Sequence, residues 1–336
     1  MSEIASVAIQ ASQFPGAVRR DLLESLRSRR VNHKFHYDSV KQTQKWLALH
    51  HVHSPSRNDA DCAAIYDRSF QTAAAKIKTR RVHLIGLGCG GGQKDTRLAK
   101  LLNTGGRDIY YSPCDVSTAM VLVAREAALT ALPAPNCYPF VCDLASADDL
   151  ADYFHRNTPA KAARLLTFFG MIPNFAPEEI LPKLAALVRP QDFLLFSANL
   201  APGNDYAAGM KIILPQYDNP LTRDWLLTFL LDFGVERKDG ELRFSIKDGA
   251  AGLKQIVAEF HFTKTRRIEI ENDRFDFFAG DFVRLFFSYR YTPDRVRNIL
   301  AGHNLKVLNE WIAGSEEEGV FLCKPSAEEL NSALED

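Results

Sequence analysis

A run of aliphatic residues that breaks abruptly into glycines limits most strongly what this 336-residue chain can fold into. The segment "VHLIGLGCGGGQKD", residues 82–95, holds five glycines, at Gly86, Gly88, Gly90, Gly91 and Gly92. A strand that leads into a glycine loop and then a helix lets backbone amides and the helix N-terminus approach a ligand closely. Each added glycine costs backbone entropy, which close approach to a ligand offsets. The segment therefore predicts a strand–loop–helix unit that binds a ligand.

The glycine spacing fits two cofactor-binding signatures. Gly86, Gly88 and Gly91 form G-x-G-x-x-G, which is typical of dinucleotide binding. Gly86, Gly88 and Gly90 form G-x-G-x-G, which is the loop of S-adenosylmethionine enzymes. The loop alone does not choose between them.

Uninterrupted apolar runs that alternate with helical patterns predict a parallel sheet covered on both faces, which is a doubly wound domain. The five runs are residues 81–88, 108–116, 137–144, 164–170 and 191–200. A helix, a strand, a turn and a further strand over 293–324 suit the reversed end of a methyltransferase sheet. We expect the core to comprise residues 77–200 and 291–326.

Two other regions flank or interrupt this core. Residues 1–76 carry helical patterns and no strand pattern, so we expect a mainly helical N-terminal segment. Residues 201–290 lose the alternating rhythm: a loop over 201–220 precedes a helix at 221–234 and several antiparallel strands with short polar turns. We interpret 201–290 as an inserted domain.

Composition restricts the class of partner. The 41 basic and 41 acidic residues cancel, which argues against nucleic acid or an acidic membrane and favours a small molecule. No stretch approaches the roughly 20 apolar residues of a membrane span, and the first residues lack the features of a secretory signal, so we expect a cytoplasmic location. The six cysteines form no zinc-ligand spacing, and we expect no metal. No pattern defines an oligomeric state.

Residues beyond the loop favour S-adenosylmethionine over a nicotinamide cofactor. Asp115 ends the second predicted strand, where either cofactor wants an acid for its ribose hydroxyls. Asp143 ends the third, where S-adenosylmethionine enzymes often place a carboxylate or amide near the adenine amino group. The only Tyr-x-x-x-Lys of a reductase, Tyr37 to Lys41, precedes the glycine loop instead of following the fourth strand. We therefore predict S-adenosyl-L-methionine as the cofactor and S-adenosyl-L-homocysteine as its product.

Several motifs together carry a resemblance to a known family. They are "HKFHYDS", "LIGLGCGGGQKDTRLAKLL", "YYSPCDVS", "RLLTFFGMIPNFAPEEI", "YDNP" and "FAGDFVRLFFSYRYT". In this order they resemble the histidine Nα-methyltransferase family of the ergothioneine pathway, over nearly the whole chain. The resemblance implies a Rossmann-like class I methyltransferase α/β sheet with helices on both faces. It also implies an α+β lid, built from 201–290 and the N-terminal segment, that binds the substrate.

The resemblance also implies site residues. In addition to the loop glycines, Asp115 and Asp143, it assigns Lys94 and Gly170 to cofactor binding. It places the head group of an amino acid against Tyr37, Asn174 and Tyr217. Tyr37 and Asn174 would orient the amine that accepts the methyl group, and Tyr217 would bind the carboxylate.

The part of the pocket that receives the substrate side chain departs from the family pattern. Phe286 stands where the family has a glutamate that binds imidazole, whereas Ser288 is kept. Either His53 or Ser54 stands where the family has a tyrosine. Phe286 and Phe287 lie on opposite faces of a strand, so at most one of them lines the pocket; the family register chooses Phe286. Because a buried polar partner for imidazole is missing, we expect an acceptor other than histidine, with a less polar or aromatic tail.

The sequence thus predicts an S-adenosylmethionine-dependent N-methyltransferase that acts on an amino acid or an amino-acid-like small molecule. Two alternatives remain open at this point. One is a genuine L-histidine Nα-methyltransferase in which another residue replaces the glutamate. The other is a relative that binds S-adenosylmethionine and has lost its chemistry.

Overall fold

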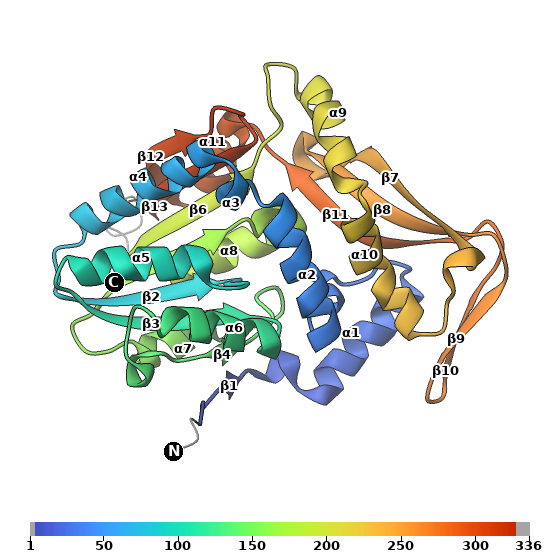
Figure 1. The fold of residues 1–336 in the computed structure, drawn as a ribbon, viewed down its shortest axis with the longest axis horizontal. Helices are drawn as coiled ribbons and strands as arrows, with labels where there is room; N and C mark the ends of the chain where they lie inside the picture. The colour runs from blue at the N-terminus through green and yellow to red at the C-terminus, as the bar shows by residue number, and fades with distance from the viewer. Residues whose placement is uncertain (1–3, 327–336) are drawn as a thin grey trace, which may run out of the picture.

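Eight strands form the large sheet of the structure, a computed structural model that describes residues 4–326 (Figure 1). In spatial order they are β1 (Ala8–Ile9), β4 (Phe140–Val141), β3 (Asp108–Asp115), β2 (Arg81–Leu87), β5 (Ala163–Phe169), β6 (Phe193–Asn199), β13 (Glu318–Pro325) and β12 (Leu305–Ile312). The strands from β1 to β6 pair in parallel, and β13 runs antiparallel to both β6 and β12. This arrangement confirms the five predicted strands, the reversed end and the class I methyltransferase fold.

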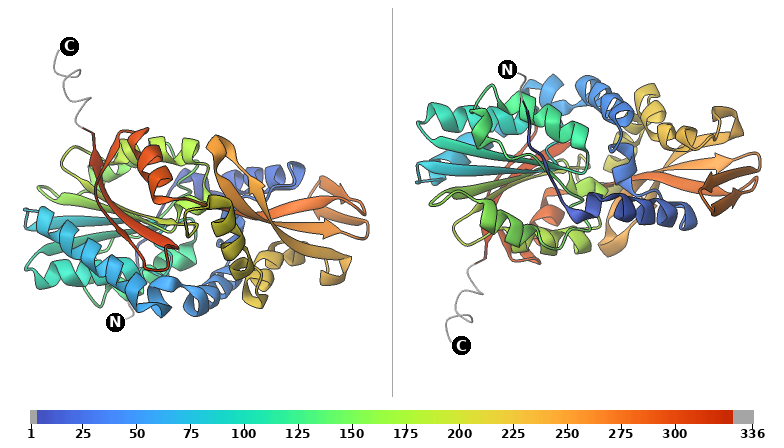
Figure 2. Two further views of the ribbon diagram at one scale, coloured as in Figure 1. Left: turned by 90° about the horizontal axis from the view of Figure 1, so that it is seen from above. Right: turned by 90° about the horizontal axis from the view of Figure 1, so that it is seen from below.

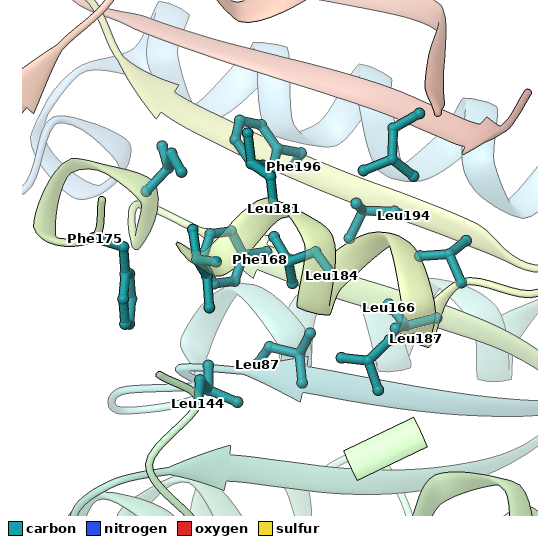
Figure 3. Packing of buried hydrophobic residues seen from close by; sticks show 14 of the residues in the cluster. Leu87, Leu144, Leu166, Phe168, Phe175, Leu181, Leu184, Leu187, Leu194 and Phe196 are labelled. Atoms are coloured by element: carbon teal, nitrogen blue, oxygen red, sulfur yellow. The ribbon is translucent and has the colours of Figure 1, made fainter. Parts of the chain in front are cut away.

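Helices cover both faces of the sheet because apolar side chains project from both faces of each buried strand. On β2, Leu84 belongs to a cluster with α4 and α5, whereas Ile85 belongs to the opposite cluster with α8; Leu165 and Leu166 on β5 divide in the same way. Figure 3 shows α8 side chains packed over the strands. Full burial of one such leucine contributes about 1.5–3 kcal/mol. The core helices are α4 (Ala60–Lys76), α5 (Gln93–Thr104), α6 (Thr118–Ala128), α7 (Leu150–Asn157), α8 (Pro177–Leu187) and α11 (Pro293–Ala301).

Residues 206–290, here called the second lobe, lie to one side of the core (Figure 2). A three-stranded antiparallel sheet in the order β11-β8-β7 is covered by two helices, and a hairpin extends from it. Asn219 begins α10 by accepting a hydrogen bond from the Thr222 amide. The elements are α9 (Tyr206–Tyr217), α10 (Pro220–Asp232), β7 (Gly240–Asp248), β8 (Lys254–Phe262), β9 (Arg266–Ile270), β10 (Asp273–Phe277) and β11 (Phe282–Arg290).

The N-terminal segment packs against both lobes. Helix α1 (Pro15–Arg27) and a 3₁₀ turn at His33–His36 share a hydrophobic cluster with α10 and β11 of the second lobe. Helix α2 (Val40–His53) lies between the lobes in Figure 1, followed by the short α3 (Pro55–Asn58). No helix within residues 4–326 is long and apolar enough to span a membrane.

Three elements differ from the sequence-based expectations. The predicted loop over 201–220 is wrong, because α9 occupies Tyr206–Tyr217, capped by Asp205, which accepts hydrogen bonds from the amides of Ala207 and Ala208. Turn-forming residues on both sides and Pro215 in the last turn hide this helix in the sequence. Strand β1 in the N-terminal segment and β10 in the hairpin are two further elements that the sequence pattern did not predict.

A buried ion pair links β5 to the start of β6. Arg164 is 1% exposed and its Nε donates to Oδ2 of Asp192, 2.7 Å away; Asp192 itself is fully buried. The Arg189 backbone amide and side chain also donate to Asp192. Asp192 therefore neutralises a guanidinium that water cannot reach.

Removing this carboxylate leaves an uncompensated buried charge. We expect Asp192→Ala to lower the free energy of unfolding by about 3–5 kcal/mol in urea titrations. The control is Asp148→Ala, which removes an exposed partner of Lys183 and costs less than about 1 kcal/mol. Equal losses in the two variants would contradict the importance of this pair.

Candidate functional site

A cavity of about 1150 Å³ lies at the carboxyl edge of the core sheet, and the second lobe and α2 contribute to its walls. Ligand pockets usually measure about 300–1,000 Å³, so this one has room for a cofactor and a second molecule. All but one of the predicted site residues line it. They are Tyr37, His53, Gly88, Gly90, Lys94, Asp115, Asp143, Gly170, Asn174, Tyr217, Phe286 and Ser288.

Gly86 is the exception, because it lies within β2 and does not line the cavity. A Cβ atom on Gly86 would stand 2.2 Å from Oδ2 of Asp95, in the first turn of α5. Asp95 occupies this space and accepts hydrogen bonds from Tyr111 on β3 and Thr167 on β5. The missing side chain of Gly86 thus makes room for a carboxyl group of the protein.

Gly88 and Gly90 shape the loop itself. Both have positive φ angles, of 66° and 51°, which side chains other than that of glycine rarely adopt. A Cβ on Gly88 would meet the Met171 side chain at 2.4 Å, and one on Gly90 would meet Trp46 of α2 at 3.0 Å. The loop therefore has close neighbours on two sides, and its backbone faces the cavity.

Asp115 connects the glycine loop to α6 at the carboxyl end of β3. One of its carboxylate oxygens accepts from the Gly90 amide and the other from the Ser117 amide, both at 3.1 Å. Burial raises the pKa of Asp115 to about 6. An acceptor at this place beside a glycine loop fits the ribose hydroxyls of S-adenosylmethionine, so the residues present suit this cofactor.

Asp143 follows β4 and has two partners within the chain. Its Oδ1 accepts from the Ala145 amide at 2.9 Å, and Oδ2 lies 3.6 Å from Nζ of Lys34, which is only 1% exposed. Asp143 also lines the cavity, where it anchors the N-terminal segment to the core.

Lys94 lies in a polar network near the start of α5. Its Nζ donates to the Tyr66 hydroxyl at 2.9 Å and lies 3.9 Å from Glu318, and burial lowers its pKa. Ser197 Oγ lies 2.9 Å from the Tyr66 hydroxyl and accepts from the Gly170 amide at the same distance. Lys94 and Gly170 are thus linked through one chain of hydrogen bonds on the cavity wall.

Aromatic rings surround the part of the cavity where Tyr37 lies. The Tyr37 ring centroid is 6.0 Å from that of Trp46 and 5.4 Å from that of Trp225. Burial raises the pKa of the Tyr37 phenol well above its usual value, and Asp115 and Tyr217 add to the shift. Tyr37 therefore remains a neutral hydroxyl, able to donate and to accept a hydrogen bond.

Asn174 is held in place by the second lobe. Its Nδ2 donates to the backbone carbonyl of Phe287 on β11, 2.8 Å away. This bond identifies Oδ1 as the acceptor that remains for a ligand. Asn174 thus joins the loop after β5 to β11 in addition to lining the cavity.

Strand β11 presents alternate residues to the cavity. Phe286 and Ser288 line it, whereas Phe287 does not and instead packs beneath the Arg284 guanidinium. Tyr217 of α9 contacts both lining residues: its hydroxyl is 2.7 Å from Ser288 Oγ, and its ring centroid is 6.1 Å from that of Phe286. Of the two phenylalanines, Phe286 therefore lines the cavity, which agrees with the choice that the family register makes.

His53, the last residue of α2, is exposed at the cavity rim.

Among the described residues, no three His, Cys, Asp or Glu side chains form a group that could hold a metal ion.

Sequence reasoning missed three residues of this site. Trp46 stacks on His50 with ring centroids 4.7 Å apart and lies next to Gly90, but no motif in the sequence marks it as a site residue. Met171 fills the space beside Gly88. Arg290 lines the cavity two positions beyond Ser288, and the period-two pattern of β11 could have revealed it.

The sheet order, the glycine loop and Asp115 define an S-adenosylmethionine-dependent methyltransferase of class I fold. A family model described as "Histidine-specific methyltransferase, SAM-dependent" matches residues 18–225, which is more than half of the chain. The chain belongs to this family, and S-adenosylmethionine is its methyl donor.

Individual relatives are more distant. The N-methyltransferase imqF of Aspergillus flavus is 24% identical over 247 residues, which are 71% of this chain; the chain spans 65% of that relative's length. Magnesium protoporphyrin IX methyltransferase from Synechocystis PCC 6803, solved with bound S-adenosylhomocysteine, is 14% identical, with a TM-score of 0.44 over 85% of this chain and 95% of its own. The CcbJ methyltransferase from Streptomyces caelestis is 11% identical, with a TM-score of 0.40 over 78% of this chain and 90% of its own.

The loop glycines offer a test of the cofactor site. We expect Gly88→Ala to weaken calorimetric binding of S-adenosylhomocysteine, because the new Cβ displaces Met171 and strains the left-handed backbone by about 1–2 kcal/mol. Gly106→Ala is the matched control: its φ is 72°, with no atom within 4 Å of the new Cβ. It should lose similar stability and keep wild-type affinity, and equal affinities in both variants would exclude the proposed cradle.

Proposed function

We propose that this chain transfers the methyl group of S-adenosylmethionine to the amino group of an amino acid, or of an amino-acid-like small molecule, other than histidine. The observation that carries this proposal is one cavity, lined both by the glycine loop with Asp115 and by Asn174, Tyr37 and Tyr217. The name of the curated relative imqF, an N-methyltransferase, supports nitrogen as the methyl acceptor.

The cofactor supplies a methyl group already activated by its sulfonium. The residues of the chain then have to align the acceptor nitrogen and deliver it unprotonated. Oδ1 of Asn174 and the neutral hydroxyl of Tyr37 can accept hydrogen bonds from an amine and leave its lone pair directed at the methyl group. Burial among aromatic rings disfavours the charged ammonium and lowers its pKa, which helps to deliver the amine unprotonated.

We further propose that residues 1–76 and 201–290 act together as the lid over the acceptor. Support comes from the hydrophobic cluster that joins α1 and the His33–His36 turn to α10 and β11. The Trp225 indole also donates to the His36 carbonyl at 2.7 Å. Because both parts contribute cavity walls, closing the lid would exclude water from the acceptor.

The acceptor tail would meet an aromatic wall. Phe286 packs between Tyr217 and Trp225, with ring centroids 6.1 and 5.8 Å away. An imidazole placed there would lose hydrogen bonds to water without gaining one from Phe286. The wall instead suits an apolar or aromatic side chain.

Asn174→Ala tests the role assigned to the head-group residues. We expect methyl transfer from S-adenosylmethionine, measured by mass spectrometry across a panel of L-amino acids, to fall by about 10²-fold because the amine is no longer aligned. Affinity for S-adenosylhomocysteine should stay unchanged. The control is Asn136→Ala, whose Nδ2 also donates to a backbone carbonyl but lies outside the cavity. Wild-type activity in Asn174→Ala would refute the assignment.

Phe286→Glu tests the exclusion of histidine. A carboxylate at this position can accept a hydrogen bond from imidazole, so we expect histidine methylation to rise at least about tenfold while turnover of apolar amino acids falls. Phe286→Gln introduces a side chain of similar size to glutamate but without charge, so comparing the two variants separates the effect of charge from that of shape. If the unaltered protein already methylates histidine as fast as its best acceptor, the chain is a histidine methyltransferase and this part of the proposal fails.

A further inference from the structure

Arg290, the last residue of β11, is a buried cation that has no counterion among residues 4–326. Its residue exposure is 5%, and it lines the cavity described above. No acidic side chain among residues 4–326 forms an ion pair with it. A buried guanidinium is costly unless a charge partner compensates it, so the absence of one within this part of the chain calls for an explanation.

The hydrogen bonds of Arg290 are incomplete as well. One terminal nitrogen donates to the Tyr217 hydroxyl at 2.9 Å, and the other donates to the Leu200 carbonyl at 3.4 Å, which is a long bond. The Nε atom is buried and has no partner. The guanidinium is thus held in position while part of its donor capacity stays unused.

The acids that line the same cavity are already engaged elsewhere. Their partners are Thr167 and Tyr111 for Asp95, the Gly90 and Ser117 amides for Asp115, Lys34 for Asp143, Gln216 for Glu317, and Tyr66 and Lys94 for Glu318. The charge that Arg290 lacks must therefore come from outside these acids.

The hydroxyl groups of Tyr217 and Ser288 add further hydrogen-bond donors beside Arg290. Because the Tyr217 hydroxyl accepts from Arg290, its own proton is free to be donated to Ser288 Oγ, 2.7 Å away. The Ser288 hydroxyl proton is then available to a ligand. Arg290, Tyr217 and Ser288 thus form a site rich in donors around one positive charge, which is the chemistry that binds a carboxylate.

We propose that Arg290 binds the carboxylate of the methyl acceptor, together with Tyr217 and Ser288, and thereby restricts the acceptor to amino acids that retain their carboxylate. This inference rests on the proposed function and narrows it, since a decarboxylated amine would leave Arg290 buried and unpaired. Arg290 is then a specificity-determining residue of the reaction.

The order of groups along β11 agrees with this assignment. Phe286, Ser288 and Arg290 are spaced by two, so they share one face of the strand. Asn174 binds the Phe287 carbonyl between them. An amino acid can therefore place its tail at Phe286, its amine at Asn174 and its carboxylate between Ser288 and Arg290.

Matched pairs of acceptors test the proposal. Methyl transfer by the full chain is measured for L-phenylalanine against 2-phenylethylamine, L-tryptophan against tryptamine, and L-leucine against isopentylamine. We expect kcat/KM for the acid to exceed that for its amine by about a hundredfold or more in the best pair, because the amine leaves a buried charge unpaired. Binding of each compound in the presence of S-adenosylhomocysteine is followed by calorimetry.

Variants of Arg290 test whether this residue causes the preference for the amino acid over its decarboxylated amine. In Arg290→Met the acid should lose its advantage over the amine, whereas Arg290→Lys, which keeps the charge, should restore part of it. The control is Arg284→Met on the same strand, because the Arg284 side chain lies over Phe287 and does not line the cavity. It should keep the preference of the unaltered protein.

The melting temperature of Arg290→Met without ligand distinguishes a ligand-binding arginine from a structural one. If Arg290 is kept for a ligand, Arg290→Met removes an uncompensated charge, and its melting temperature should equal or exceed that of the unaltered protein. A marked fall in melting temperature would instead indicate a structural arginine and overturn the proposal.

The possible failures are distinguishable. Equal turnover of acid and amine, or an undiminished preference in Arg290→Met, overturns the carboxylate site and leaves N-methylation standing. If no member of any pair is bound or methylated, the proposed function fails, and this inference fails with it.

Discussion

The carboxyl group of Asp95 holds the centre of this molecule together. It enters the space that Gly86 leaves on β2 and accepts hydrogen bonds from Tyr111 on β3 and Thr167 on β5. One side chain from the first turn of α5 therefore fastens that helix to three adjacent strands, and the glycine loop between β2 and α5 is held at both ends. Burial raises the pKa of Asp95 to about 6, although its hydrogen bonds oppose the shift. A rigid loop presents its amides in one arrangement, which is what a preorganised cofactor site requires.

Much of the fold can be predicted from the sequence because the core strands are buried on both faces. Residues 165–169 and 193–196 are almost entirely apolar, and their side chains divide between the hydrophobic clusters on the two faces of the sheet, as expected for a parallel sheet covered on both sides. Helix α9 could not be predicted, because turn-forming residues flank it on both sides and Pro215 lies in its last turn. The two-residue β1 is too short to show a period, and its pairing with β4 depends on the folded core.

Site residues that belong to a local sequence motif could be predicted. Site residues that reach the cavity only through tertiary packing mostly could not. Asp115, Asn174 and Tyr217 follow from local motifs, and all three line the cavity. Trp46 reaches the glycine loop only because α2 packs between the lobes. Lys34 becomes the partner of Asp143 across more than a hundred positions, a pairing that no spacing rule contains. Arg290 resembles an ordinary strand arginine in the sequence, and only the folded structure shows that its Nε is buried without a hydrogen-bond partner among the described residues.

The chain passes four times between the core sheet and the side of the molecule that carries α1 and the second lobe. It leaves the core sheet after β1 for α1, returns through α2 and α3 to α4, leaves again between β6 and α9, and comes back between β11 and α11. Four connections of the chain thus join the two parts that supply the cavity walls, so the chain itself limits how far these walls can separate.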